Sequence, residues 1–324
     1  MGWLRPSKEE AAAREASRVA QAAAERSRLL VERGGLPEAA AERMRHMAES
    51  GNVPFQSALT AADHTLVVQA GMQPLGHVMG TSVVKIAAQK LSWSLWGMRS
   101  SGMGGGYWSG PQFGHVDWMR DGWRMAYRRA FHRLEEEARL IGADLVLGVE
   151  IRRHARAFTE GAIEIWAGGT AVRLPGGSGS ERPALTTLTA EDAVKLRQAG
   201  LRPAGAVYGV AAIVAAESPQ QRSMHATFLG SGYRNQEMPD YTRLTYMARG
   251  EAMRDVSEQA VAIGASGIVG VQLSHHVERE VEETFELRMQ TMHVLATAIA
   301  GTPHPSPPIP IVIDLTATKR KPRR

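Results

Sequence analysis

The sequence predicts an α+β protein that contains two tandem copies of one small α/β sandwich-like domain. Three observations support this prediction: a repeat near the start of each copy, a second repeat later in each copy, and a Gly- and Ser-rich linker between them. The length of 324 residues agrees, because one domain contains roughly 150 residues.

The first repeat relates residues 59–80 to residues 188–209. Eleven of the 22 aligned positions are identical without a gap, far more than chance would give. In each copy a threonine precedes an aspartate by three residues, a spacing typical of a helix N-terminus, and Gly71 or Gly200 follows where the helix would end. Each copy is therefore expected to open with a short helix and then a strand that begins near Pro74 or Pro203.

The second repeat relates residues 138–154 to residues 260–276, at the end of a longer predicted helix. One apolar stripe runs along this helix in both copies. Its members are Phe131, Leu134, Ala138 and Ile141 in the first copy and Met253, Val256, Ala260 and Ile263 in the second. The runs LVLGVEI and GIVGVQL that follow are expected to form mostly buried strands, and residues 161–174 and 281–300 add a last strand to each copy.

The domain boundaries follow from these blocks and from the segments that flank them. We expect a helical N-terminal extension at 1–56, the first copy at 57–174, a linker at 175–184, the second copy at 185–300, and a Pro-rich, basic, disordered tail at 301–324. The tail holds five cationic side chains, which equal the formal net charge of +5. We therefore expect no nucleic-acid-binding face on the folded part, and at most weak contact of the tail with polyanions.

Composition and missing motifs exclude several kinds of site. Cysteine is absent, which excludes disulfides, thiolate metal ligands and a Cys nucleophile. The sequence contains no uncharged apolar stretch long enough for a membrane span and no signal-like segment, so we expect a cytoplasmic protein. Catalytic and cofactor-binding motifs are not recognisable, so neither an enzyme nor a cofactor is predicted, and the acidic run 135–137 is interpreted as a solvated helix face.

Residues 92–123 are the most unusual part of the sequence, because they combine many glycines with five of the seven tryptophans. Two interpretations stay open for this segment. Its rings cover a sheet or a neighbouring subunit, or they form a surface that binds a protein partner or an apolar ligand. The candidate residues for a ligand or partner surface are Trp93, Trp96, Tyr107, Trp108, Trp118 and Trp123.

The histidines offer one candidate metal group, formed by His154, His275 and His276. His154 and His276 occupy aligned positions in the second repeat. Imidazoles bind zinc and copper, but a metal centre needs three or four converging ligands. Successive strand residues point to opposite faces, so His275 and His276 are by default surface residues of a strand.

The repeated pattern resembles the YbjQ-like family, which is described as binding heavy metals. The resemblance rests on the Gly-x-Val-x-Gly strand at 76–80, on the segments IGADLVLGV and IGASGIVGV, and on the closing GTAV, and it covers about 57–174 and 185–300. It implies a compact α+β fold, ring-like homo-oligomers that are commonly pentamers, and no established enzymatic activity. The expected function is therefore a non-enzymatic, ring-forming scaffold or binding protein. The alternative is a protein that binds a small molecule or a metal ion through residues 92–123 or the histidines.

Overall fold

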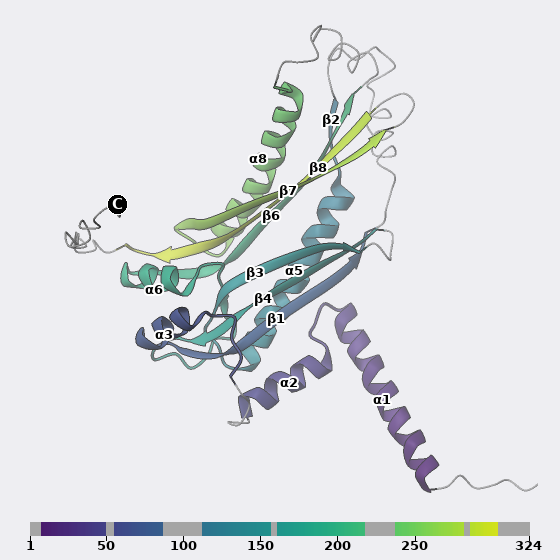
Figure 1. Cartoon of the computed structure of the whole chain (residues 1–324), viewed down its shortest axis with the longest axis vertical. Helices are drawn as coiled ribbons and strands as arrows, with labels where there is room; N and C mark the ends of the chain where they lie inside the picture. The colour runs from purple at the N-terminus through teal and green to yellow at the C-terminus, as the bar shows by residue number, and fades with distance from the viewer. Residues whose placement is uncertain are drawn as a thin grey trace, which may run out of the picture.

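The structure of the protein is a computed structural model that describes residues 8–49, 55–86, 112–156, 161–217, 237–281 and 286–303. This part of the chain has the predicted α+β class, with helices packed on two four-stranded sheets (Figure 1). Its helices are α1 (Lys8–Glu32), α2 (Glu38–Glu49), α3 (Ala61–Gln69), α5 (Asp117–Leu140), α6 (Ala190–Gln198) and α8 (Pro239–Ala262). Its strands are β1 (Gln73–Lys85), β2 (Gln112–His115), β3 (Leu145–Arg156), β4 (Ala162–Arg173), β5 (Ala184–Leu185), β6 (Leu201–Glu217), β7 (Gly267–Val281) and β8 (Glu286–Gly301).

The two sheets have the strand orders β1-β4-β3-β5 and β2-β6-β8-β7. We call them sheet 1 and sheet 2, and we call residues 55–174 the first half and residues 184–301 the second half. In each sheet three long antiparallel strands come from one half, and one short strand comes from the other. Thus β5 of the second half joins β3 in parallel, and β2 of the first half joins β6.

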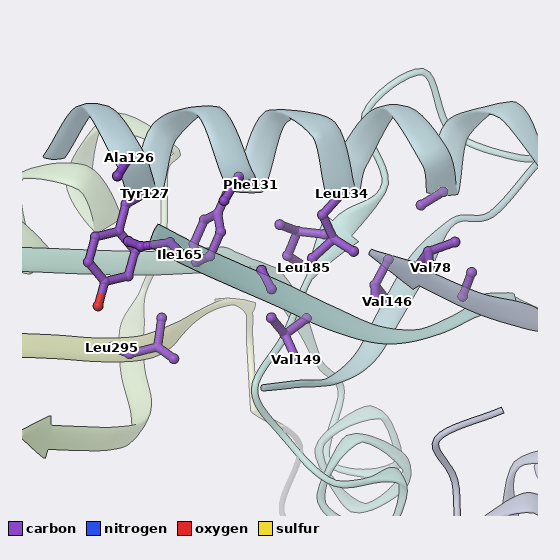
Figure 2. Close-up of a cluster of buried hydrophobic side chains, with 14 of the residues drawn as sticks. Val78, Ala126, Tyr127, Phe131, Leu134, Val146, Val149, Ile165, Leu185 and Leu295 are labelled. Atoms are coloured by element: carbon purple, nitrogen blue, oxygen red, sulfur yellow. The ribbon is translucent and has the colours of Figure 1, made fainter. Parts of the chain in front are cut away.

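One long helix packs on each sheet, because its apolar stripe needs a sheet face to cover. Helix α5 lies on β1 and β4 and also contacts β6, whereas α8 lies on β6 and β8. Figure 2 shows Tyr127, Phe131 and Leu134 of α5 pointing from the helix toward the strands beneath it. The same buried cluster contains Leu185 and Leu295, so the core under α5 is built by both halves.

The local signals of the first repeat are present in the structure. Thr60 and Thr189 cap α3 and α6, and each hydroxyl accepts a hydrogen bond 3.1 Å long from the backbone N–H three residues later. Gly71 and Gly200 follow these helices with φ of 74° and 79°, a conformation that a residue with a Cβ rarely adopts. The strands that follow, β1 and β6, carry matching register shifts at Pro74/Gly76 and Pro203/Gly205.

The repeated Gly80 and Gly209 have a packing reason. A Cβ added at Gly80 would lie 2.0 Å from the carbonyl oxygen of Ala130 in α5, and one at Gly209 would lie 1.9 Å from that of Ala252 in α8. Only glycine lets the two backbones approach this closely. Each long helix therefore rests directly on the backbone of its first long strand.

The N-terminal extension is helical, with two helices of different burial. Helix α2 inserts the buried Met44 into the core of the first half, while α1 is largely exposed and extends away from the sheets (Figure 1). No helix in the described part of the chain is long and apolar enough to cross a membrane.

The prediction that GIVGVQL forms a mostly buried strand is wrong. Val271 and Leu273 of the GIVGVQL strand, β7, are exposed, and so is Ile263, the last member of the apolar stripe. The aligned residues Val149 and Ile141 of the first half are buried, and residues 184–188 of the second half lie directly against Val149. The sequence pattern is the same in both halves, and the difference is which part of the chain covers it.

Candidate functional site

The candidate site is the contact between the two halves, which we call the seam. It consists of residues 184–188 against β3, of α6 against α3 and β3, and of α5 against β6. Figure 1 shows α3 and α6 side by side at the same end of the two sheets.

Residues 184–188 run along the edge of β3 through four backbone hydrogen bonds. The amides of Ala184 and Thr186 donate to the carbonyls of Asp144 and Val146, at 3.0 and 2.9 Å. In return the amides of Val149 and Gly148 donate to the carbonyls of Thr186 and Leu188, at 2.8 and 3.0 Å. Gly148 adopts a φ of 62° in a bulge that the β3–β4 ladder skips, which frees these two amides for the incoming segment.

A buried threonine holds this segment to its own half. The Thr297 hydroxyl on β8 lies 3.1 Å from the Thr186 hydroxyl and accepts from the Thr187 amide at 3.0 Å. The first half repeats the arrangement: Thr170 on β4 lies 3.1 Å from the Ser57 hydroxyl and accepts from the Ala58 amide at 3.1 Å. The segments 184–188 and 55–59 are therefore held in the same way on their respective sheets.

Aromatic side chains fill the seam between α5 and sheet 2. Tyr127 stacks on Tyr208 with ring centroids 4.8 Å apart, and Phe131 meets Tyr208 edge-on at 5.4 Å. Trp123 packs edge-on against His293 at 4.7 Å. Such offset and edge-on pairs add about 0.5–1.5 kcal/mol each beyond the area they bury, so the cluster holds the halves together.

The buried imidazole and the two phenols of this cluster stay uncharged near neutral pH. Burial lowers the pKa of His293 to about 3, and the Nδ1 atom of this residue has no hydrogen-bond partner among the described residues. Burial raises the pKa of Tyr208 to about 12 and also raises the pKa of Tyr127. Arg153 also reaches this cluster, and its Nε donates to the Tyr127 hydroxyl. The pKa values of the buried imidazole and of the two phenols are therefore shifted away from neutral pH, where they would suit proton transfer.

An ion pair crosses the seam beside the aromatic rings. Arg124 of α5 donates to both carboxylate oxygens of Asp255 in α8, with Nη2 2.5 Å from Oδ1 and Nε 3.1 Å from Oδ2. Asp255 is nearly buried and also accepts from the amide of Val210 at 3.3 Å. The pair thus joins α5, α8 and β6, because one carboxylate serves both a side chain and a backbone donor.

Glu137 corrects the interpretation of the acidic run 135–137 as a solvated face. Its side chain is buried, accepts from the Met79 amide at 2.8 Å and pairs with Arg43 of α2 at 2.9 Å. Burial raises the pKa of this carboxyl, while these two partners lower it. In the second half Gln259 takes the same place and accepts from the Tyr208 amide at 3.2 Å. Both side chains fasten a long helix to its strand.

A groove of about 490 Å³ opens along the seam between the end of α5 and the end of α8. Charges of both signs line it, and burial raises the pKa of the Glu135 carboxyl in its wall. The charged and amide side chains in the wall are His132, Glu135, Glu136, Arg139, Glu181, Arg182 and Gln259. The groove suits a polar ligand or a charged peptide segment better than an apolar molecule.

The predicted aromatic surface is only partly described by the structure. Trp93, Trp96, Tyr107 and Trp108 lie outside the described residues. Trp118 and Trp123 belong to α5 rather than to a loop, and both are partly buried and pack against the apolar clusters at the seam. Sequence reasoning missed Tyr127, Tyr208 and His293, although Trp123, Tyr127 and Phe131 follow each other by four residues, the spacing of one helix face.

The structure does not bring the three predicted metal-binding histidines together. His154 lies on β3 in sheet 1, and His275 and His276 are consecutive on β7 in sheet 2, all three exposed. His276 lies 3.7 Å from the carboxylate of Glu278, its neighbour two residues along the strand. Within the described ranges, no group of three His, Asp or Glu side chains is placed to hold a metal ion.

Comparison with known proteins yields two matches. Residues 113–175 match the YbjQ family, described as "Putative heavy-metal-binding". The donor atoms present do not fit that description, because the chain has no cysteine and its described residues form no such three-ligand group. No solved structure matches the chain.

The second match is to a protein of Mycobacterium tuberculosis strain H37Rv, named encapsulin nanocompartment protein Rv1762c. The two are 30% identical over 227 residues, which make up 68% of this chain and 78% of that protein. The matched length exceeds that of either half, so the similarity includes residues from both sides of the seam. The chain belongs to the family of this mycobacterial encapsulin nanocompartment protein.

Proposed function

We propose that this chain is a non-enzymatic, homo-oligomeric component of an encapsulin nanocompartment. The observation that carries the proposal is the match to the mycobacterial protein of that name, across 78% of its length. The chemistry of the seam and of the neighbouring helix–strand contacts supports a structural role, because the buried polar groups there fasten helices to strands. Glu137 and Asp255 each accept from a backbone amide and pair with an arginine.

We infer that residues 57–174 and 185–300 are two copies of one domain. The aligned repeats support this, and so do the paired local features: the threonine caps of α3 and α6, the bulges at Gly148 and Gly270, and the close helix approach at Gly80 and Gly209. The helix caps, the bulges and the close helix contacts depend on different interactions, yet all three occur at aligned positions of the two segments. Chance similarity would not produce this agreement.

We infer further that the chains assemble head to tail into a closed ring, with five chains as the number that the family resemblance implies. A duplicated chain supports this arrangement, because the contact between its two copies is a heterologous one, and such contacts build rings when the rotation closes. The cytoplasm is the expected compartment.

The proposal is tested in cells that make the protein. Intact nanocompartments are isolated by sedimentation and size-exclusion chromatography, and the chain is quantified by mass spectrometry together with the major shell protein. A fixed ratio of the chain to the shell protein through both steps, and after a high-salt wash, supports the proposal. If the chain separates from intact compartments and migrates at the mass of its own oligomer, the nanocompartment assignment is wrong.

Protease treatment of the same particles then locates the chain. Digestion before and after the particles are opened distinguishes an interior component from an exposed one. A cytoplasmic enzyme from the same lysate, degraded under both conditions, is the matched control.

A further inference from the structure

We propose that the free edge of β7 binds residues 55–59 of a second copy of this chain. This contact repeats between chains the one that residues 184–188 make with β3 inside a chain. The inference rests on the proposed homo-oligomer and names the two surfaces that build it. We call residues 55–59 the arm and residues 266–273 the acceptor edge.

The acceptor edge has the backbone shape of the occupied edge on β3. The β3–β4 ladder skips Gly148 and Val149, whose amides bond to residues 184–188. The β7–β8 ladder skips the aligned Gly270 and Val271, and Gly270 has a φ of 63° against 62° at Gly148. In the described part of sheet 2, β7 is the outermost strand, so no strand pairs with its outer edge as β5 pairs with the outer edge of β3.

Apolar side chains at the acceptor edge are more exposed than their counterparts on β3. Val149 is 3% exposed, whereas the aligned Val271 is 40% exposed. Leu273, two residues further along β7, is 47% exposed, whereas the aligned Ile151 is partly buried. Exposed apolar side chains beside an outermost strand are typical of a contact with another molecule, and the alignment indicates which molecule.

The arm is already held in the conformation that the contact requires. The arm repeats the hydrogen bonds that fix residues 186–188 on Thr297. In the arm these bonds involve the hydroxyls of Ser57 and Thr170 and the amides of Ala58 and Leu59. Little conformational freedom is then lost on binding, which favours association.

The outward side of the arm is uncovered as well. Phe55 and Ala61 are exposed, whereas Ala190, which aligns with Ala61, is buried at the seam. Both surfaces of the proposed contact are therefore available in a single chain.

The contact is head to tail between chains. The arm is bonded to β4 of sheet 1, and the acceptor edge belongs to sheet 2, so each chain offers one arm and one acceptor edge. By alignment with the parallel pairs Leu145–Ala184 and Val146–Leu185, Phe55 faces Gly267 and Gln56 faces Ile268 of the neighbouring chain. A repeated contact of this type closes into a ring or extends as a filament.

Cross-linking tests the register directly, and the absence of cysteine makes the background clean. A chain with Gln56→Cys and Ile268→Cys is assembled, oxidised so that directly paired thiols form a disulfide, and separated on a non-reducing denaturing gel. The inference predicts a ladder of covalent multimers from the double variant and none from either single variant, whose thiols have no partner in reach. A double variant that stays at the mass of one chain, while the untreated protein is an oligomer, overturns the inference.

A charge-insertion test uses matched exposed positions. Val271→Lys with Leu273→Lys is expected to weaken self-association by at least about 100-fold, because two ammonium groups would be buried without partners. Val68→Lys is the control, since Val68 is 52% exposed and its aligned residue, Arg197, stays exposed at the seam. Circular dichroism checks that all variants keep their fold, and native mass spectrometry reports the chain number.

The outcomes separate the two proposals. A parent protein that is monomeric at every concentration contradicts the homo-oligomer itself, and with it this contact. A parent that is oligomeric, and stays so in the double-lysine variant, leaves the homo-oligomer standing and refutes the acceptor edge. Loss of the oligomer in the double-lysine variant but not in Val68→Lys supports the acceptor edge.

Discussion

Replacing Gly209 by alanine should destabilise the protein strongly, although the added group is a single methyl. That carbon would lie 1.9 Å from the carbonyl oxygen of Ala252 and 2.7 Å from its carbonyl carbon. Carbon atoms ordinarily approach to no less than about 3.5 Å, so α8 would have to move by roughly 1 Å. Overpacking of this kind costs about 3 kcal/mol, since the obstacle is helix backbone rather than a flexible side chain.

Gly250→Ala, in the same helix, is the matched control. A Cβ there meets nothing within 4 Å, so the substitution should stabilise α8 by about 0.5–1 kcal/mol through helix propensity alone. Urea unfolding followed by circular dichroism at one protein concentration measures both effects. At a slope of about 3 kcal/mol/M, Gly209→Ala should lower the midpoint by about 1 M. A midpoint within the error of the parent would show that the helix does not rest on this strand.

Two further predictions concern buried polar groups. The pKa of His293 is lowered to about 3 from 6.5, so between these pH values the unfolded chain binds more protons and the free energy of unfolding falls as the pH drops. From pH 7 to pH 5 the parent should lose about 2 kcal/mol more than His293→Phe, as measured by urea unfolding. Equal losses in the two proteins would contradict the buried neutral imidazole. Glu137→Gln should cost under about 1 kcal/mol, because the side-chain oxygen of Gln259 already accepts from a strand amide at the matching place in the second half. Glu137→Leu should cost about 3 kcal/mol, because it leaves the Met79 amide unpaired. Thermal unfolding measures both variants, and similar midpoints would refute the role of that hydrogen bond.

Local signals in the sequence predict the elements well. The threonine caps and the following glycines place α3 and α6, and the apolar stripe places α5, because these signals act over a few residues. Glu137 was predictable in principle. It lies three residues after Leu134 and four before Ile141, and so on the buried stripe, but the flanking Glu135 and Glu136 suggest a solvated face.

The long-range pairing was not predictable from these signals. Nothing local indicates that β2 and β5 join the sheet of the other half, because two-residue and four-residue strands carry no periodicity. The segments LVLGVEI and GIVGVQL have the same pattern, yet the first strand is mostly buried and the second is mostly not. The reason is that residues 184–188 form hydrogen bonds along the edge of the first strand only. For the same reason the aromatic seam was missed: Tyr208 and His293 meet Tyr127 only after both sheets have formed.

The reciprocal placement of β2 and β5 has a consequence for how the molecule can be divided. Cutting the chain anywhere between Pro175 and Pro183 gives two fragments. Each fragment then contains one short strand that belongs to the sheet of the other: β2 in the first and β5 in the second. We expect neither fragment to fold independently, because each would lose an edge strand of its sheet. The two sheets are therefore expected to unfold in one transition, and a shorter version of this protein would have to retain both.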